Sequence, residues 1–454
     1  MKNKTTVQDL TQGKPMKLLL GFAVPLVFGL LFQQFYNLAD TVIVGQTLGT
    51  DALAAVGSTG SINFLIIGFC IGLCTGFSIP VAQQFGAGDE KALRRFAANG
   101  IWLSAVFAVG ITVLVLLLCR PILQIMRTPD NIFEDSFSYI FVIFLGIPAT
   151  FLYNLLASFI RSLGDSKTPV FILTGAALLN IVLDLLFILV LHWGVAGAAL
   201  ATVISQVIAG LACLWFVVAK VPLLHMKKEE WKLDKPTLRI LCAMGLPMGL
   251  QYSITAIGSV VLQTSVNALG SLAVAAVSTA NKIGSFFTCI YDALGSTMAT
   301  YGGQNVGARK LDRVERGLKD CILLGAVYSV FALAIILSVG KYLPQMFVAN
   351  ADPVLYDMAF QVLLYNAFFY FPLALVNIIR FMVQGLGFSK LAVLAGVCEM
   401  AARAIAGFVL VPMFGFTAVG FASPLAWVAA DVFLIYAYRR VMGQLRITMA
   451  ETLS

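Results

Sequence analysis

Charged residues and histidine are scarce in this 454-residue chain. Asp, Glu, Lys and Arg together make up 11% of the residues and there are two histidines, whereas 60% of the residues are hydrophobic. A soluble domain of this length cannot bury so much apolar surface. The composition therefore excludes an ordinary soluble protein and predicts a membrane protein.

Motifs for direct ATP use, for hydrolysis and for ion-channel selectivity are also missing. The sequence contains no GxxxxGK[ST], HExxH, GxSxG or TVGYG-like segment. Its eight cysteines have no metal-ligand or disulfide spacing. We therefore expect neither an enzyme nor a cofactor-dependent protein. The eight cysteines stand at positions 70, 74, 119, 213, 242, 289, 321 and 398.

Long apolar runs are what the sequence does contain. A helix that crosses a bilayer needs about 20 mainly apolar residues, and these runs are too long and continuous for the strands of a membrane barrel. The prediction is an all-α membrane protein with twelve transmembrane helices. The expected spans are 17–44, 54–82, 96–118, 134–160, 168–191, 195–219, 239–267, 277–301, 317–340, 356–383, 390–413 and 417–438.

Basic residues follow the order of these spans. Of the 30 Lys and Arg residues, 24 fall in the two termini or in loops on the same side of the membrane as the termini, and three fall on the other side. Because Lys and Arg concentrate in cytoplasmic loops, both termini are expected in the cytoplasm and the protein in the inner membrane. The net charge of +8 thus reflects topology, and no nucleic-acid partner is expected.

The two halves of the chain resemble each other at a near-constant offset along the sequence. LGTDALAAV at 48–56 resembles LGSLAVAAV at 269–277, and IRSLGDSKTP at 160–169 resembles VQGLGFSKLA at 383–392. Between the halves lies the longest polar segment, 220–239. We predict two pseudo-symmetric six-helix lobes, 1–225 and 226–454, inserted the same way up as in parallel-repeat transporters.

Ionisable and polar residues inside the first-half spans are the candidate functional residues, because charge in hydrocarbon is costly. Asp40 ends the first span, and Asn180 and Asp184 share one helix face. Thr202 lies in the sixth span, and Tyr139 and Asn154 lie in the fourth. The group can carry a proton on a carboxyl, or bind sodium through its oxygens. A purely structural, hydrogen-bonded role for the two acids is the alternative.

The second half does not repeat this group. At the repeat offset, Asp40 corresponds to Leu262. The eleventh span instead carries Glu399 and Arg403, four residues apart, for which an intrahelical ion pair is expected. Asp292 is the second-half acid best placed to contact a cation. Pro25, inside the first span, frees a carbonyl and permits a kink that either gates or is static.

In this order, the segments NLADTVIVGQTLGTDALAAVG, GAGD, RSLGDSKTP and NIVLDLLFILVLHWGVAGAALAT resemble the multidrug and toxic compound extrusion (MATE) family from about Lys14 to Arg440. The resemblance implies two lobes, alternating access, and exchange of drugs or organic cations for protons or sodium. It also implies a cation site at Asp40, Asn180, Asp184 and Thr202, with Tyr139 and Asn154 adjacent. The acids that some members carry in the seventh and tenth spans are absent here, which favours coupling in the first lobe.

Two other functions remain open at this point. One is a flippase for a lipid-linked or amphipathic metabolite, which would be expected to carry more basic charge inside its spans. The other is a receptor or scaffold that transports nothing. Nothing in the sequence requires a partner subunit, so a monomer in the bilayer is expected.

Overall fold

The described part of the chain is helical. The computed structural model describes residues 8–347 and 352–451, and within these ranges there is no β-strand, which confirms the all-α prediction. The helices are α1 (Pro15–Leu48), α2 (Thr50–Ser58), α3 (Gly60–Ala87), α4 (Glu90–Ile125), α5 (Asp130–Leu145), α6 (Ile147–Ser162), α7 (Lys167–Leu185), η1 (Leu186–Val190), α8 (Gly194–Lys220), η2 (Pro222–Leu224), α9 (Lys235–Asn267), α10 (Ser271–Gly307), α11 (Leu311–Val339), α12 (Leu343–Phe347), α13 (Pro353–Phe368), α14 (Tyr370–Gly385), α15 (Ser389–Ile405), η3 (Ala406–Leu410), α16 (Val411–Phe414) and α17 (Phe416–Glu451).

Twelve membrane spans follow from these helices. Ten are each long and apolar enough to cross a bilayer, counting α7 with η1 and α15 with η3 and α16 as single helices. Two more spans are bent pairs, α5 with α6 at 44° and α13 with α14 at 54°. Each bend lies just before a proline, Pro148 or Pro372, whose missing N–H interrupts the helical hydrogen bonds. The prediction of twelve transmembrane helices is confirmed.

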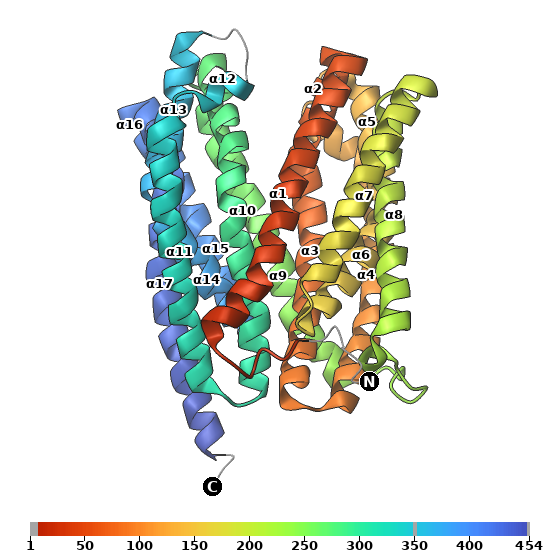
Figure 1. Ribbon diagram of the computed structural model, residues 1–454. Helices are drawn as coiled ribbons and strands as arrows, with labels where there is room; N and C mark the ends of the chain where they lie inside the picture. The colour runs from red at the N-terminus through yellow and green to blue at the C-terminus, as the bar shows by residue number, and fades with distance from the viewer. Residues whose placement is uncertain (1–7, 348–351, 452–454) are drawn as a thin grey trace. The chain divides into compact units, whose positions relative to one another are not determined.

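The described helices form two compact units. The first contains residues 28–249 together with Gln8 and Asp9, and the second contains residues 10–27, 250–347 and 352–451. Within the first unit, α3 packs on α4 and α6, and α8 packs on α5, α6 and α7 (Figure 1). These bounds differ from the predicted lobes 1–225 and 226–454, because the first part of α9 belongs to the first unit and the first part of α1 to the second.

Glycine explains why α9 begins in the first unit. A Cβ atom on Gly76 of α3 would lie 2.5 Å from the Cα atom of Gly245, and one on Gly72 would lie 2.6 Å from the carbonyl oxygen of Met248. Only helices without side chains at the contact approach this closely in a membrane. The polar segment 220–239 therefore lies before the unit boundary and does not mark it.

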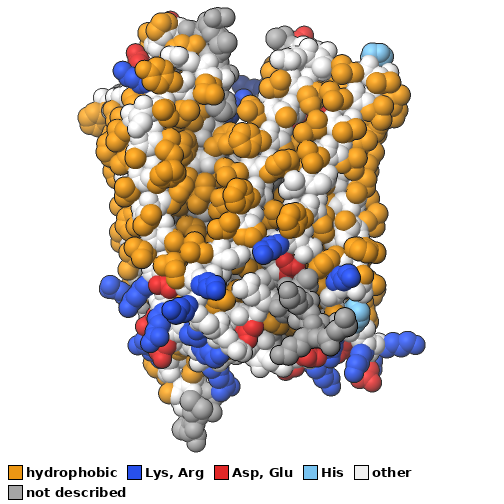
Figure 2. All heavy atoms as spheres, viewed as in Figure 1, with side chains coloured by type: hydrophobic (Ala, Val, Ile, Leu, Met, Phe, Trp, Pro, Cys, Tyr) orange, Lys and Arg blue, Asp and Glu red, His pale blue; other side chains and the backbone are white. Residues whose placement is uncertain are grey.

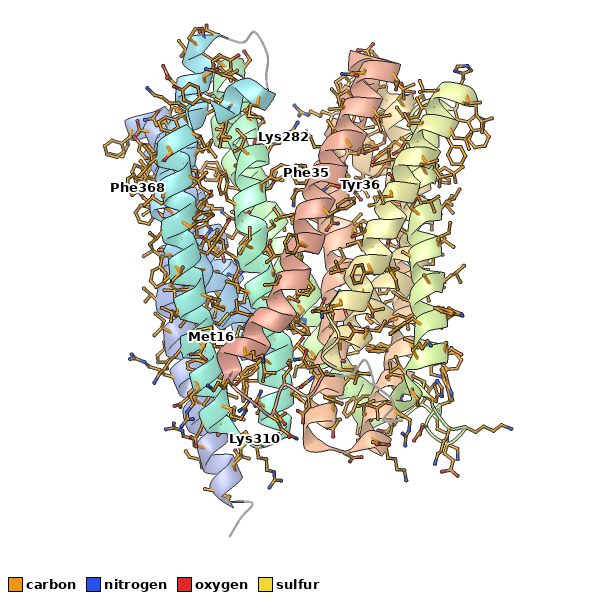
Figure 3. The ribbon with its side chains drawn as sticks, in the orientation of Figure 1. Met16, Phe35, Tyr36, Lys282, Lys310 and Phe368 are labelled. Carbon is orange, nitrogen blue, oxygen red and sulfur yellow. The ribbon has the colours of Figure 1, made fainter. Side chains whose placement is uncertain are left out.

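The segment before α1 is held in the second unit by hydrogen bonds. The Leu10 N–H donates to Gln304 Oε1 at 2.9 Å, and Lys310 Nζ donates to the Thr11 carbonyl oxygen at 2.9 Å. Arg313 Nη1 donates to the Gly13 carbonyl oxygen at 2.8 Å. Lys310 projects from the start of α11 (Figure 3). These contacts place the first residues of α1 with α10 and α11.

The internal repeat is visible in the backbone. Both halves have a bent fourth span and a π-helix within the last part of the fifth span, η1 beginning at Leu186 and η3 at Ala406. Residues with a positive φ angle, in the left-handed backbone region, also recur at one constant offset between the halves. The three pairs are Gly49 and Gly270, Gly88 and Arg309, and Gly194 and Gly415.

Charge gathers at one end of each unit. On the face shown in Figure 2, hydrophobic side chains cover the middle of the helices, and Lys, Arg, Asp and Glu concentrate at one end. That end is where α3 joins α4 in the first unit and where α10 joins α11 in the second. An apolar belt beside a charged end is the surface of a protein that spans a bilayer.

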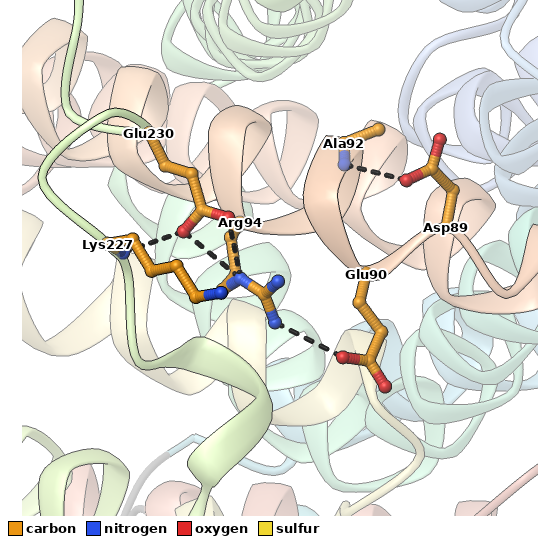
Figure 4. Close-up of polar contacts among 6 residues, drawn as sticks. All are labelled: Asp89, Glu90, Ala92, Arg94, Lys227 and Glu230. Atoms are coloured by element: carbon orange, nitrogen blue, oxygen red, sulfur yellow. Dashed lines mark hydrogen bonds and ion pairs between the residues drawn. The ribbon is translucent and has the colours of Figure 1, made fainter.

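The segment 221–234 docks on α4 through a buried carboxylate. Arg94 Nε donates to Glu230 Oε1 at 2.8 Å, and the backbone N–H of Lys227 donates to Glu230 Oε2 at 2.7 Å (Figure 4). Burial alone would raise the pKa of Glu230, but the hydrogen bonds from Arg94 and Lys227 outweigh it, and the pKa lies below the usual value. The ionised carboxylate therefore stabilises this docking.

Replacing Glu230 by Gln is expected to lower the free energy of unfolding by about 1–3 kcal/mol, because the half-buried Arg94 loses the closer of its two anionic partners and keeps only the exposed Glu90. The loss should shrink on acidification. A depressed pKa gives stability that is present above the ordinary Glu pKa and is lost as the pH falls through the folded value. Thermal unfolding of the purified protein in detergent at several pH values measures both effects. The exposed neighbour Glu229 provides the control, Glu229→Gln. Equal unfolding midpoints for the two variants would contradict this role of Glu230.

Candidate functional site

Three helices of the first unit each present two polar residues four positions apart. These pairs are Tyr36 and Asp40 on α1, Asn180 and Asp184 on α7, and Thr202 and Gln206 on α8. Residues four apart lie one above the other on the same helix face. Because α7 packs on α8, and Tyr36 projects from α1 beside α7 (Figure 3), the three pairs form one polar cluster.

Thr202 lies at the centre of the cluster. Asn180 Nδ2 donates to Thr202 Oγ1 at 3.5 Å, and Thr202 Oγ1 donates to the Ala198 carbonyl oxygen of its own helix at 3.2 Å. The Tyr36 hydroxyl lies beside the Thr202 hydroxyl. The hydroxyl group of Thr202 thus links α7 and α1 to α8.

The carboxyl groups of Asp40 and Asp184 lie next to each other. Asp184 is fully buried, and the hydroxyls of Tyr36 and Tyr139 are close enough to interact electrostatically with both acids. Among the described residues, no Lys or Arg forms an ion pair with either acid. Two adjacent carboxylates without a cation repel each other, so the pair favours a bound proton or a bound cation.

Acceptor oxygens outnumber donors in the cluster. Asp40 Oδ1, Asn180 Oδ1 and both carboxyl oxygens of Asp184 are buried and have no hydrogen-bond partner among the described residues. Leaving such groups unpaired costs about 1–3 kcal/mol each. A proton or a hard cation with oxygen ligands would relieve that cost, and the donor set therefore fits sodium as well as H⁺.

A cavity of about 40 Å³ opens beside the cluster. It can hold water-sized guests, and the two acids lie one helical turn beyond the residues that line it. The lining residues are Gly29, Phe32, Gln33, Tyr36, Leu173, Ala176, Ala177, Asn180, Thr202, Ser205 and Gln206. Gly29 is required here, since a Cβ atom at this position would lie 2.8 Å from Val170 Cγ2 of α7. Tyr36, Asn180 and Thr202 therefore belong both to the lining of this cavity and to the polar cluster.

The structure brings five of the six predicted first-half residues together. Asp40, Asn180, Asp184, Thr202 and Tyr139 share the cluster, whereas Asn154 Nδ2 donates to the Thr150 carbonyl oxygen of its own helix at 2.8 Å.

Sequence reasoning missed Tyr36, Ser205 and Gln206. The spacing of four that links Tyr36 to Asp40 and Gln206 to Thr202 was the available signal. Within the described residues, no group of three or more His, Cys, Asp or Glu side chains is arranged around a metal.

Pro25 lies inside α1, and the helix continues through it from Pro15 to Leu48. Its ring leaves the carbonyl oxygen of Gly21 without a helical N–H donor. Pro25 belongs to the part of α1 that packs in the second unit, and the acid pair contacts the part in the first. Its role in gating stays a prediction.

The second unit contains a different set of charges. The expected pair is present, with Arg403 Nη2 3.6 Å from Glu399 Oε2. A second arginine, Arg380 of α14, donates to the other oxygen of Glu399. Asp292 is exposed on α10, and its charge interacts with Arg380. Glu399 and Asp292 thus lie near arginines, unlike Asp40 and Asp184.

Comparison with known proteins places this architecture in a family. The sequence matches the MatE family over residues 25–186 and again over 247–409. The first match begins at Pro25 and the second at Pro247, and the spacing between these two prolines agrees with the offset of the internal repeat. It is 30% identical over 373 residues to the "Probable multidrug resistance protein YpnP" of Bacillus subtilis (strain 168), covering 82% of each chain. It is 25% identical over 377 residues to the "FAD transporter" of Shewanella oneidensis, covering 80% of each.

A solved structure shares the fold over nearly the whole length. It is described as "Outward-facing conformation of a multidrug resistance MATE family transporter of the MOP superfamily". The TM-score is 0.90 at 23% identity, covering 98% of this chain and 99% of the other. The family match spans more than half of the chain, and its two segments coincide with the two repeated halves. The protein is therefore a member of the multidrug and toxic compound extrusion family of multi-span membrane transporters.

Proposed function

We propose that the protein is a secondary active antiporter that exports organic cations or drugs in exchange for protons or sodium. The observation that carries this proposal is the adjacent pair of Asp40, which is half-buried, and Asp184, which is fully buried. Three of their carboxyl oxygens, Asp40 Oδ1 and both oxygens of Asp184, have no hydrogen-bond partner among the described residues. Charges in a membrane span are rare and mark ion or proton pathways. Relatives named for multidrug resistance support the substrate class.

The coupling follows from the charge of the acid pair. When the pair binds an ion from outside, its repulsion falls and α1 and α7 can stay close at Asp40 and Asp184. When the ion leaves, the repulsion returns and favours a different arrangement of the same helices. An ion shifts this equilibrium only by its differential affinity for the two states. In this proposal the protein works as a monomer in the cytoplasmic membrane, with both termini in the cytoplasm.

Export of an amphipathic metabolite, or its flipping between leaflets, is the alternative. It is supported by the similarity to a relative named FAD transporter. Two buried arginines in the second unit, Arg380 and Arg403, could attract an anionic group, but both are within ion-pair distance of Glu399. Their partial neutralisation favours cationic substrates over anionic ones.

Replacing Asp40 or Asp184 by Asn is expected to lower ethidium efflux by about tenfold or more. A loss of that size corresponds to a coupling free energy in the range usually found between two binding sites. Each substitution keeps the shape of the side chain but removes the site that binds the proton or cation. Efflux is measured in energised cells that lack other pumps, at matched expression. Asp51→Asn is the control, because Asp51 is an exposed acid on α2. Wild-type efflux by both variants would refute coupling at this pair. No efflux by any protein, the wild type included, would favour the metabolite alternative.

Replacing Asn180 by Leu distinguishes sodium coupling from proton coupling. The substitution removes one buried oxygen ligand and leaves both carboxyls in place. If sodium couples, the sodium concentration for half-maximal transport should rise by about tenfold. If protons couple, transport should keep its pH dependence and stay independent of sodium. Proteoliposomes with imposed sodium or pH gradients make the measurement. Transport that responds to neither gradient, in the wild type, would contradict antiport.

A further inference from the structure

Four charged side chains are buried together in the second unit. Arg380 of α14, Glu399 and Arg403 of α15, and Asp431 of α17 are 5%, 4%, 8% and 7% exposed. The three helices pack on one another. Asp431 lies about four turns after the start of α17 at Phe416, roughly 22 Å along the helix and thus well inside the span. Hydrocarbon and packed helices therefore surround the group, and each charge needs a reason to be there.

The two acids of this group differ in the number of cations that they contact. Glu399 has two cations, since Arg380 Nη2 donates to its Oε1 and Arg403 Nη2 lies 3.6 Å from its Oε2. Asp431 has no direct ion pair among the described residues, and its Oδ1 is buried without a hydrogen-bond partner. Arg380 Nε is also buried and unpartnered. An unused acceptor and an unused donor thus lie in the same buried group.

Arg380 is the charged residue that acts on Asp431. The two lie within electrostatic reach of each other, although Arg380 is hydrogen-bonded to Glu399. Arg380 also interacts with Arg403, with Tyr252 of α9 and with Asp292 of α10. From α13, Tyr365 stacks on Phe421, almost three turns before Asp431. The short elements η3 and α16, which also pack on α17, contain no ionisable side chain.

We propose that Asp431 is a second proton-binding carboxyl of the transport cycle, and that Arg380 controls it by exchanging its partner between Glu399 and Asp431. This rests on the proposed ion-coupled antiport and adds a site in the other half of the repeat. While Arg380 is bonded to Glu399, Asp431 is buried without a cation, and a proton removes the cost of the buried anion. Unlike a larger cation, a proton can bind to Asp431 without a cavity beside the carboxyl group.

The exchange balances in charge and in hydrogen bonds. When Arg380 turns to Asp431, the bond from Arg380 to Glu399 breaks and a bond from Arg380 to Asp431 forms. The proton leaves Asp431 for water. Arg403 stays beside Glu399, so Glu399 is not left as an unpaired buried anion, which would cost several kcal/mol. This explains why one glutamate has two arginines. The group has net charge +1 with Asp431 protonated and zero with Asp431 ionised.

Infrared difference spectroscopy on the purified protein tests proton binding directly. The background is the double variant Asp40→Asn, Asp184→Asn, which removes the acid pair of the first unit. We expect a pH-dependent C=O stretching band of a protonated carboxylic acid in this background, and its loss on adding Asp431→Asn. Adding Asp292→Asn, which removes an exposed acid near Arg380, should leave the band. A band that survives Asp431→Asn, or is lost with Asp292→Asn instead, would overturn the proposal.

Two further variants test the control by Arg380. Glu399→Gln leaves Arg380 free to pair with Asp431, so the carboxylic-acid band should disappear at a pH at which the background protein shows it. Arg380→Gln removes the cation, so the band should persist to higher pH than in the background protein. Circular dichroism and elution as a single species in detergent check that both variants are folded. Identical pH profiles for folded Glu399→Gln, Arg380→Gln and the background would overturn the exchange.

Transport by the single variant Asp431→Asn completes the test. In proteoliposomes with a pH gradient, we expect substrate export to continue with fewer protons exchanged per substrate than in the wild type. The same stoichiometry in both would overturn a role for Asp431 in coupling. Failure of the proposed antiport can be told apart from failure of the Asp431 proposal, because the infrared band reports proton binding even if no tested substrate is exported.

Discussion

The cost of charge in hydrocarbon governs this structure. Backbone groups in the spans are satisfied inside helices, and most charged side chains lie at the ends of the units, outside the apolar belt. The charges that remain inside are few and clustered. In the first unit Asp40 lies beside Asp184, and in the second unit two arginines lie beside Glu399. Where charge is retained in a span, it needs a partner or an ion. Glu399 has two arginines as partners, and in the proposed antiport a bound ion serves Asp40 and Asp184.

The repeat provides one backbone for two kinds of chemistry. Equivalent turns, bends and π-helices recur at a near-constant offset between the halves, whereas the buried side chains have diverged. Asn180 of the fifth span corresponds to a position near Arg403 in the second half. In the proposed antiport, the acid pair without a cation responds to an ion from outside, while the acids beside arginines respond to a shift of one ion pair. The two halves can thus contribute unlike steps to one cycle.

Two helices, α1 and α9, are each divided between the two units. The first part of α1 packs in the second unit and its later part supplies Tyr36 and Asp40 to the first, and α9 is divided in the same way. Glycine contacts at Gly72 and Gly76 hold α9, and hydrogen bonds from Lys310 and Arg313 to backbone carbonyls hold the segment before α1. The helix that carries Tyr36 and Asp40 is therefore shared by both units.

The sequence by itself determined the spans, the repeat and most of the first cluster, because hydrophobic length, internal similarity and residues four apart are local properties of the chain. Asp40, Asn180, Asp184 and Thr202 were identifiable as polar residues in apolar runs. Only the tertiary structure decided that Tyr139 joins the first cluster, that Arg380 joins Glu399, and that Asp431 lies beside them. It also decided the bounds of the two units. These depend on contacts between helices far apart in the sequence, and no local pattern records which faces meet.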